Sequence, residues 1–296
     1  MTDSQQLCAS NATGDIQVRT GVLPDPFQGA KRTIVILSLA LAGCSNTVSP
    51  PTTDVVSLKL LTDNATRPLL HDLTTAYHPN GINLAWDIQV GDVRSILDWL
   101  KNAEAPYALM DYLPIGIDNS WWITPVGQDG IAIIVNSANP IASLSASQLR
   151  SILQGRVDNW KSLGGADLPL TVVARNEHSS AAALIQSIVL GQRQTTRAAR
   201  LATTSEAVIQ IVASNPGAIG YVSMGYLDSS VRAVPLDGIA LTPDTVTSRK
   251  YPITTPIVFI GLAAPANDAY RAFFAWIQSP DGQAIVRRHY GGLVGQ

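Results

Sequence analysis

From Val55 onward, short β-like runs alternate with amphipathic helical patterns, and this alternation limits the possible folds more than any other feature. The predicted strands lie at 55–61, 131–135, 170–174, 218–222 and 257–262. The predicted helices lie at 68–77, 92–101, 147–154, 181–190, 206–213, 270–277 and 283–289. In the second of these helices an apolar residue recurs every three or four positions on one face. Strands that alternate with helices predict an α/β fold.

Composition excludes several classes of protein. The 296 residues allow two domains or one large one, and 46% hydrophobic with 14% charged residues indicates a chain that buries a core. A net charge of −2 argues against nucleic-acid binding through a broad basic surface. Two cysteines and four scattered histidines predict no metal site, and we expect no cofactor. Because nucleophile-elbow and P-loop motifs are also lacking, we expect no enzyme activity; a hydrolase that uses Ser179 is the least favoured alternative.

Residues 31–44 form a pattern typical of a secretory signal. Lys31 and Arg32 precede an apolar run at 33–40, and small residues follow in Leu-Ala-Gly-Cys at 41–44. The run is far shorter than the ~20 residues of a membrane-spanning helix. Its ending is similar to the lipobox of bacterial lipoproteins, which implies a lipid on Cys44; the alternative is a buried strand that ends in a cysteine. We expect a tether at 45–53, and an extension or a mis-assigned start at 1–30.

Three further segments carry a family resemblance. They are Gly-Arg-x-x-x-Trp at the start of 155–165, Asn-Pro-Gly-Ala-Ile-Gly-Tyr-Val at 215–222 and Tyr-Pro-Ile-Thr at 251–254. In this order, the chain from about 56 to 292 resembles the periplasmic phosphate-binding proteins of ABC transporters. The resemblance implies the type II periplasmic binding protein fold, in which two α/β lobes are joined by a double-crossing hinge. We expect lobe one at 54–134 plus 251–296 and lobe two at 135–250.

Two segments have the strand, polar loop and helix that an anion site of this kind uses. They lie at 62–68 and 175–181. Unpaired N–H groups at a helix N-terminus favour negative charge, and a guanidinium such as that of Arg175 contacts two oxygens of an oxyanion at once. The ordinary alternatives are a capping Thr66, a solvated Arg67 and a surface Arg175 beside a helix cap.

The resemblance implies particular contacts. Phosphate binds Thr66, Arg67, Arg175, Ser179 and Ser180 in this picture, and Asp111 accepts the proton of hydrogen phosphate. That role of Asp111 favours phosphate over sulfate, which carries no proton at neutral pH; a solvated loop residue is the alternative. The pattern also departs from the family: Ser180 stands where glycine is usual and Ala181 where threonine is usual, Arg67 replaces an apolar residue, and 89–92 lacks the expected serines.

We therefore expect an extracytoplasmic solute-binding lipoprotein that captures inorganic phosphate between two lobes and delivers it to the permease of an ABC transporter. Its partners are the ligand, the permease subunits and, through the lipid on Cys44, the membrane; the protein is expected to be a monomer. One alternative is the same fold with another oxyanion or a small organic acid as its ligand. The other is a binding module for sensing or adhesion, without transport.

Overall fold

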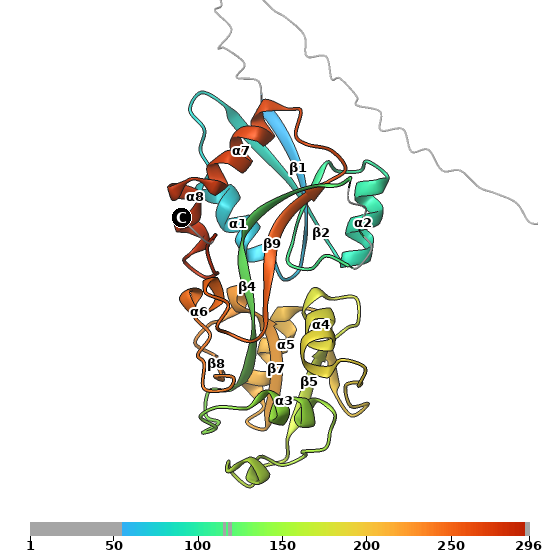
Figure 1. The fold of residues 1–296 in the computed structure, drawn as a ribbon, viewed down its shortest axis with the longest axis vertical. Coiled ribbons are helices and arrows are strands. Elements are labelled where there is room, and N and C mark those ends of the chain that lie inside the picture. The colour runs from blue at the N-terminus through green and yellow to red at the C-terminus, as the bar shows by residue number, and fades with distance from the viewer. Residues whose placement is uncertain (1–54, 115–116, 118–119, 294–296) are drawn as a thin grey trace, which may run out of the picture. The chain divides into compact units, whose positions relative to one another are not determined.

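The computed structural model describes residues 55–114, 117 and 120–293, which belong to one compact unit. The predicted signal, the tether and Cys44 lie outside the described residues. Nine strands, within the described residues, form one sheet: eight of them follow the order β2-β1-β3-β9-β4-β7-β5-β6, and the ninth, β8, pairs with β4 off this path (Figure 1). Their bounds are β1 Val55–Asp63, β2 Asn83–Gly91, β3 Tyr107–Met110, β4 Trp122–Asn136, β5 Thr171–Arg175, β6 Arg200–Ala202, β7 Ala218–Ser223, β8 Val231–Ala233 and β9 Thr254–Gly261.

Helices connect most of the strands, which confirms the predicted α/β class. They are α1 Arg67–Ala76, α2 Val93–Lys101, α3 Ala146–Leu153, α4 Ser180–Leu184, α5 Ser205–Ser214, α6 Pro243–Thr247, α7 Asp268–Gln278 and α8 Pro280–Val286, with short turns η1 Trp160–Leu163, η2 Ile185–Leu190 and η3 Met224–Tyr226. Local chemistry sets several ends. Ser145 and Gln148 form a capping box at the start of α3, and Gly155, at φ 72°, turns the chain after it. The helix predicted at 181–190 is α4 continued by the π-helical turn η2.

β4 belongs to both halves of the sheet. Its first part pairs antiparallel with β9, up to Gly130 opposite Thr254, and its second part pairs with β7 from Ile131 onward. Figure 1 shows β4 and β9 side by side and β4 continuing to β7. The partner of β4 therefore changes between Gly130 and Ile131. The lobe boundaries at 54–134 plus 251–296 and at 135–250 stay a prediction.

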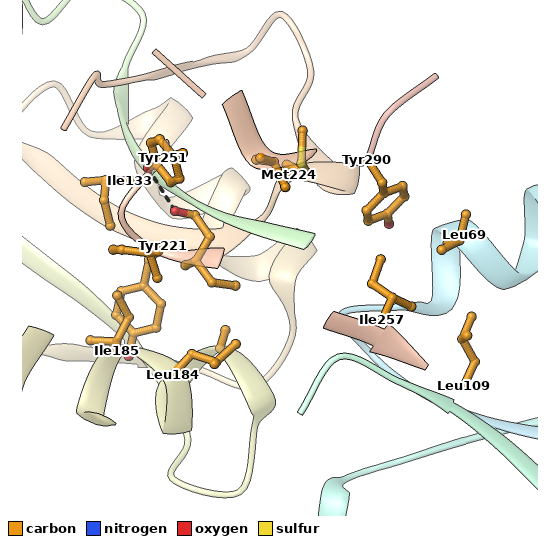
Figure 2. Packing of buried hydrophobic residues seen from close by; sticks show 14 of the residues in the cluster. Leu69, Leu109, Ile133, Leu184, Ile185, Tyr221, Met224, Tyr251, Ile257 and Tyr290 are labelled. Carbon is orange, nitrogen blue, oxygen red and sulfur yellow. Dashed lines mark hydrogen bonds between the residues drawn. The ribbon is translucent and has the colours of Figure 1, made fainter. Parts of the chain in front are cut away.

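Buried apolar residues continue from one half of the sheet to the other. One cluster includes Leu69 and Leu109 together with Ile133, Tyr221 and Tyr251 (Figure 2). The Tyr251 hydroxyl donates to the carbonyl oxygen of Ile131 at 3.0 Å, at the point where β4 changes partner. The Tyr-Pro-Ile segment thus anchors the chain beside β4 just before β9 begins.

Two of the segments that carry the family resemblance contact each other. Trp160 is 1% exposed, and its Nε1 donates to the carbonyl oxygen of Gly217 at 3.0 Å. A Cβ on Gly217 would lie 2.2 Å from the Pro169 oxygen, so only glycine allows this approach. The motif residues Trp160 and Gly217 therefore hold the 155–165 segment against the starts of β5 and β7, and their role is structural.

Candidate functional site

Four helices begin around one cavity of about 400 Å³. Its wall includes the first residues or caps of these helices: Arg67 of α1, Asp92 before α2, Ser179 before α4 and Thr204 before α5. The first turn of a helix leaves N–H groups without an intrahelical acceptor and carries the positive end of the helix dipole. The ends of α1, α4 and α5 make the cavity favourable for an anion, whereas the end of α2 already carries the carboxylate of Asp92, which accepts from the Ser95 N–H.

Arg175, the last residue of β5, supplies a buried cation to the cavity. It is 6% exposed. Its Nη1 donates to Asn64 Oδ1 at 3.0 Å and to Ser205 Oγ at 2.7 Å, and its Nη2 donates to the Thr203 carbonyl oxygen at 3.1 Å. Burial lowers the pKa of Arg175 from its usual value. Among the residues that the structure describes, Nε has no acceptor. This N–H is therefore an unpaired donor of a residue that lines the cavity.

Asn64, in the loop between β1 and α1, connects that loop to segments more than a hundred residues away. Its Oδ1 accepts from the Ser205 backbone N–H at 2.9 Å as well as from Arg175, and its Nδ2 donates to the Tyr226 hydroxyl at 3.1 Å. Tyr226 in turn donates to the Asn64 carbonyl oxygen at 2.6 Å. Asn64 therefore orients the guanidinium of Arg175 and holds the start of α5 at the cavity.

The second arginine of the cavity, Arg67, is paired with Glu206. The pair lies at the surface, with the two side chains 48% and 45% exposed. Burial by itself would lower the pKa of Arg67, but Tyr226 and Glu206 raise it; burial would raise the pKa of Glu206, but its backbone hydrogen bond and Arg67 lower it. Both groups are charged at neutral pH, so Glu206 offsets the charge that Arg67 brings to the cavity.

Asp63, the last residue of β1, is a buried carboxylate in the cavity wall. It is 3% exposed. Its Oδ1 accepts from the Thr66 N–H at 2.8 Å and from the Thr66 hydroxyl at 2.7 Å. Its Oδ2 has no donor in the described part of the chain. Thr66 itself is fully buried, and its N–H and hydroxyl are both engaged with Asp63.

Asp111 follows β3 and lies behind the cavity wall. It is fully buried, and its side chain interacts with those of Asp63 and Ser180. Burial, followed by the charges of Asp63 and Asp129, raises the pKa of Asp111 well above its usual range. Burial also raises the pKa of Asp129 to about 7, against hydrogen bonds from Ser223, Gly130 and Met224. Burial and the two neighbouring carboxylates therefore disfavour the ionised form of Asp111.

The structure brings four of the six residues predicted for the ligand site to the cavity wall: Arg67, Arg175, Ser179 and Ser180. Thr66 and Asp111 lie next to that wall, in contact with or close to Asp63. Sequence reasoning missed Asp63 and Asn64, although both lie in the loop at 62–68 that it singled out. It also missed the start of α5, where no local pattern points to a ligand.

The described residues contain neither a candidate metal site nor a helix that could span a membrane. In these residues, no three His, Cys, Asp or Glu side chains come close enough together to hold a metal ion. None of the described helices has both the length and the apolar character that crossing a bilayer requires.

Residues 99–281, more than half of the chain, match the family model of the PBP superfamily domain. The chain belongs to this superfamily. It is 34% identical to the phosphate-binding protein PstS of Bacillus subtilis over 125 residues, which cover 42% of this chain and 41% of that protein. It is 22% identical to PstS of Borreliella burgdorferi over 241 residues, 77% of this chain and 86% of the relative. The alignment with the B. subtilis protein thus spans less than half of that protein's length.

A solved structure agrees with the fold over most of its length. A putative phosphate ABC transporter substrate-binding protein from Clostridium perfringens, solved with bound phosphate, superposes with a TM-score of 0.75 at 25% identity and covers 81% of this chain and 100% of its own. An ABC-type phosphate transport receptor from Vibrio cholerae has a TM-score of 0.64 at 22% identity, covering 80% and 100%. The comparisons confirm the predicted resemblance and the periplasmic binding protein fold.

Proposed function

We propose that the chain captures hydrogen phosphate in this cavity as the solute-binding protein of an ABC transporter. One observation carries the proposal: four helix N-termini and the buried guanidinium of Arg175 surround a single cavity. The names of the relatives support phosphate as the ligand. The protein binds and releases its ligand, and no reaction is part of this function.

The proposed direct contacts are Arg175, Ser179 and Ser180. Arg175 Nε donates to one ligand oxygen, and the first turn of α4 leaves backbone N–H groups at Ser180 and Ala181 without an intrahelical acceptor. The other predicted residues act on the ligand less directly: Arg67 is paired with Glu206, while Thr66 and Asp111 act through Asp63.

A different oxyanion or a small organic acid is the second candidate ligand. The residues in one part of the cavity wall favour such a ligand. Val90, Gly91 and Ala181 line the cavity where hydroxyl donors were expected from the family pattern. The carbon skeleton of an organic acid packs against this apolar part of the wall, whereas a phosphate ion has no apolar group to cover it.

Calorimetric titration separates these ligands. The chain from Ser45 onward, which contains all of the described residues, is titrated with phosphate and with small dicarboxylates. Saturable binding of one phosphate per chain supports the proposal, provided that it survives in Arg197→Ala, which changes an exposed arginine outside the cavity wall. Binding of a dicarboxylate without binding of phosphate would move the assignment to the second candidate.

We further propose that the protein acts outside the cytoplasm, as a monomer tethered through a lipid on Cys44, and passes its ligand to the permease of the transporter. The support is the signal pattern at 31–44. In the full chain, Cys44→Ser should release the protein from the membrane fraction or leave it unprocessed, as shown by fractionation and mass spectrometry. A wild-type protein that is found free of the membrane and begins at Met1 contradicts this part of the proposal.

A further inference from the structure

The cavity has more space than an inorganic phosphate ion fills. Its volume is about 400 Å³. A water molecule occupies roughly 30 Å³ in the liquid, so an ion of five non-hydrogen atoms needs roughly 150 Å³ at the same volume per atom. Sites for small organic ligands hold roughly 300–1,000 Å³ and combine apolar walls with a few polar groups. The volume of this cavity therefore lies in the range of organic ligands.

The end of β2 gives this space an apolar wall. Parallel pairing with β1 places Val90 beside Thr62 and Gly91 beside Asp63. The Val90 side chain lines the cavity and is 44% exposed. A side chain in place of Gly91 would have to displace the ring of Trp99, because a Cβ there would lie 2.4 Å from it. The side chains of Val90 and Gly91 thus offer apolar surface and no hydrogen-bond donor.

The donors for a phosphoryl group come from other elements of the wall. Arg175 ends β5, and Ser179 and Ser180 stand at the start of α4. β2 and β5 are far apart in the strand order of the sheet. A phosphoryl group that is held by Arg175 and the start of α4 therefore leaves the space beside Val90 to a substituent on that group.

The charges of the wall limit the kind of substituent. The wall contains carboxylates, guanidiniums and one imidazole: Asp63, Asp92, Glu206, Arg67, Arg175 and His178. Asp92 lies two residues after Val90 in this wall. Burial alone would raise the pKa of Asp92, but hydrogen bonds from Ser95 lower it below its usual value, so Asp92 is ionised at neutral pH. A second anionic group on the ligand would be repelled by this carboxylate, whereas an uncharged substituent is accepted.

We propose that the cavity also takes phosphate in organic form, as a monoester of a short uncharged alcohol: Arg175 and the start of α4 bind the phosphoryl group, and the carbon chain packs against Val90. This inference rests on the proposed function, because it uses the same contacts to the phosphoryl group, and it names a further ligand class for that site. One methylene group in a closed apolar pocket changes affinity by roughly 10–200-fold. A chain that packs against one open wall gains less.

The test titrates the full-chain protein calorimetrically with inorganic phosphate, propyl phosphate and 2-carboxyethyl phosphate, in which a carboxylate replaces the terminal methyl group of the propyl chain. We expect the wild type to prefer propyl phosphate at least fivefold over inorganic phosphate and at least tenfold over 2-carboxyethyl phosphate. Val90→Ser should reduce the first preference at least threefold. Ile88→Ser is the matched control, because Ile88 lies on the same strand, is 36% exposed and is outside the cavity wall, and it should leave the preference within twofold.

Asp92→Asn tests the role of charge. Asparagine caps a helix about as well as aspartate, so α2 keeps its cap while the charge is removed. The preference for propyl phosphate over 2-carboxyethyl phosphate should fall at least threefold in this variant. Equal binding of these two esters by the wild type overturns the restriction to an uncharged substituent.

The other outcomes separate this inference from the proposed function. A wild type that binds inorganic phosphate as tightly as propyl phosphate overturns the inference while the proposed function stands, and so does a preference that Val90→Ser leaves unchanged. Binding of propyl phosphate without inorganic phosphate supports the inference and overturns inorganic phosphate as the ligand. A wild type that binds none of the three overturns both. Thermal denaturation checks folding, and Val90→Thr, which keeps the shape of the side chain, takes the place of a Val90→Ser protein that does not fold.

Discussion

At the scale of single residues, burial separates the two arginines of the cavity. Arg175 is buried and its Nε is unpaired within the described structure, whereas Arg67 is half-exposed and paired with Glu206. Removing one partner of a buried charge contact costs roughly 2–5 kcal/mol, and an exposed ion pair contributes about 0–1 kcal/mol. Arg175→Ala should therefore weaken phosphate binding by at least ~30-fold and Arg67→Ala by less than about fivefold, measured by calorimetry. Equal, small effects of the two substitutions would place the ligand elsewhere.

At the scale of elements, Trp160 joins η1 to the loop before β7. Its ring is buried, and its Nε1 donates to the Gly217 carbonyl oxygen, which also accepts from the Thr171 N–H at 2.9 Å. Trp160→Ala should lower the free energy of unfolding by about 3–5 kcal/mol, because a large buried ring is lost. Trp160→Phe keeps a buried ring, and the Gly217 carbonyl oxygen still accepts from the Thr171 N–H. This substitution should therefore lower the free energy of unfolding by about 1 kcal/mol. Urea denaturation measures both.

Trp160 lies outside the cavity wall, so this prediction has a second part. Phosphate affinity of the folded Trp160→Phe protein should equal that of the wild type. A large loss of affinity without a loss of stability would show that the family segment at 155–165 contributes to the ligand site and not only to packing.

At the scale of the whole molecule, the buried carboxyl groups make stability depend on pH. Asp129 is fully buried where β4 changes partner, and its Oδ1 accepts from the Gly130 N–H at 2.8 Å and the Met224 N–H at 3.3 Å. Burial raises the pKa of Asp129 to about 7, whereas an aspartate in the unfolded chain titrates near ~3.9. Between these values the folded state binds more protons than the unfolded state. Stability contributed by this group is therefore present below pH ~4 and lost as the pH rises through about 7.

Asp129→Asn should remove this dependence while keeping the acceptor for Gly130 and Met224. The difference in free energy of unfolding between the variant and the wild type should shift in favour of the variant by about 1 kcal/mol or more from pH 5 to pH 8. This corresponds to a rise of ~2–4 °C in the Tm of the variant relative to that of the wild type. Differential scanning calorimetry of both proteins at the two pH values measures it, with the exposed Asp98→Asn as control. Parallel pH profiles of Asp129→Asn and wild type would show that Asp129 does not titrate in this window.

Local sequence patterns were sufficient to predict most of the helices and strands. All seven helices predicted from apolar periodicity and all five predicted strands have counterparts in the described structure, with ends shifted by a few residues in most cases. The predictions omitted β2 and β3, the short strands β6 and β8, the short helix α6 and the first half of β4. β2 is an edge strand with no fully buried residue. It therefore lacks the apolar run by which a buried strand is recognised.

The sequence by itself predicted the α/β class and singled out the loops at 62–68 and 175–181, including Arg175, which lies in the cavity wall. Only the tertiary structure decided that Asp63 lines the cavity while Asp111 lies behind it, and that Asn64 joins Arg175 to the start of α5. Periodicity and turn chemistry act over a few residues and can be recognised locally. Which carboxylate meets the cavity depends instead on how segments about 140 residues apart pack, as Asn64 and Ser205 do at 2.9 Å, and no local pattern encodes that contact.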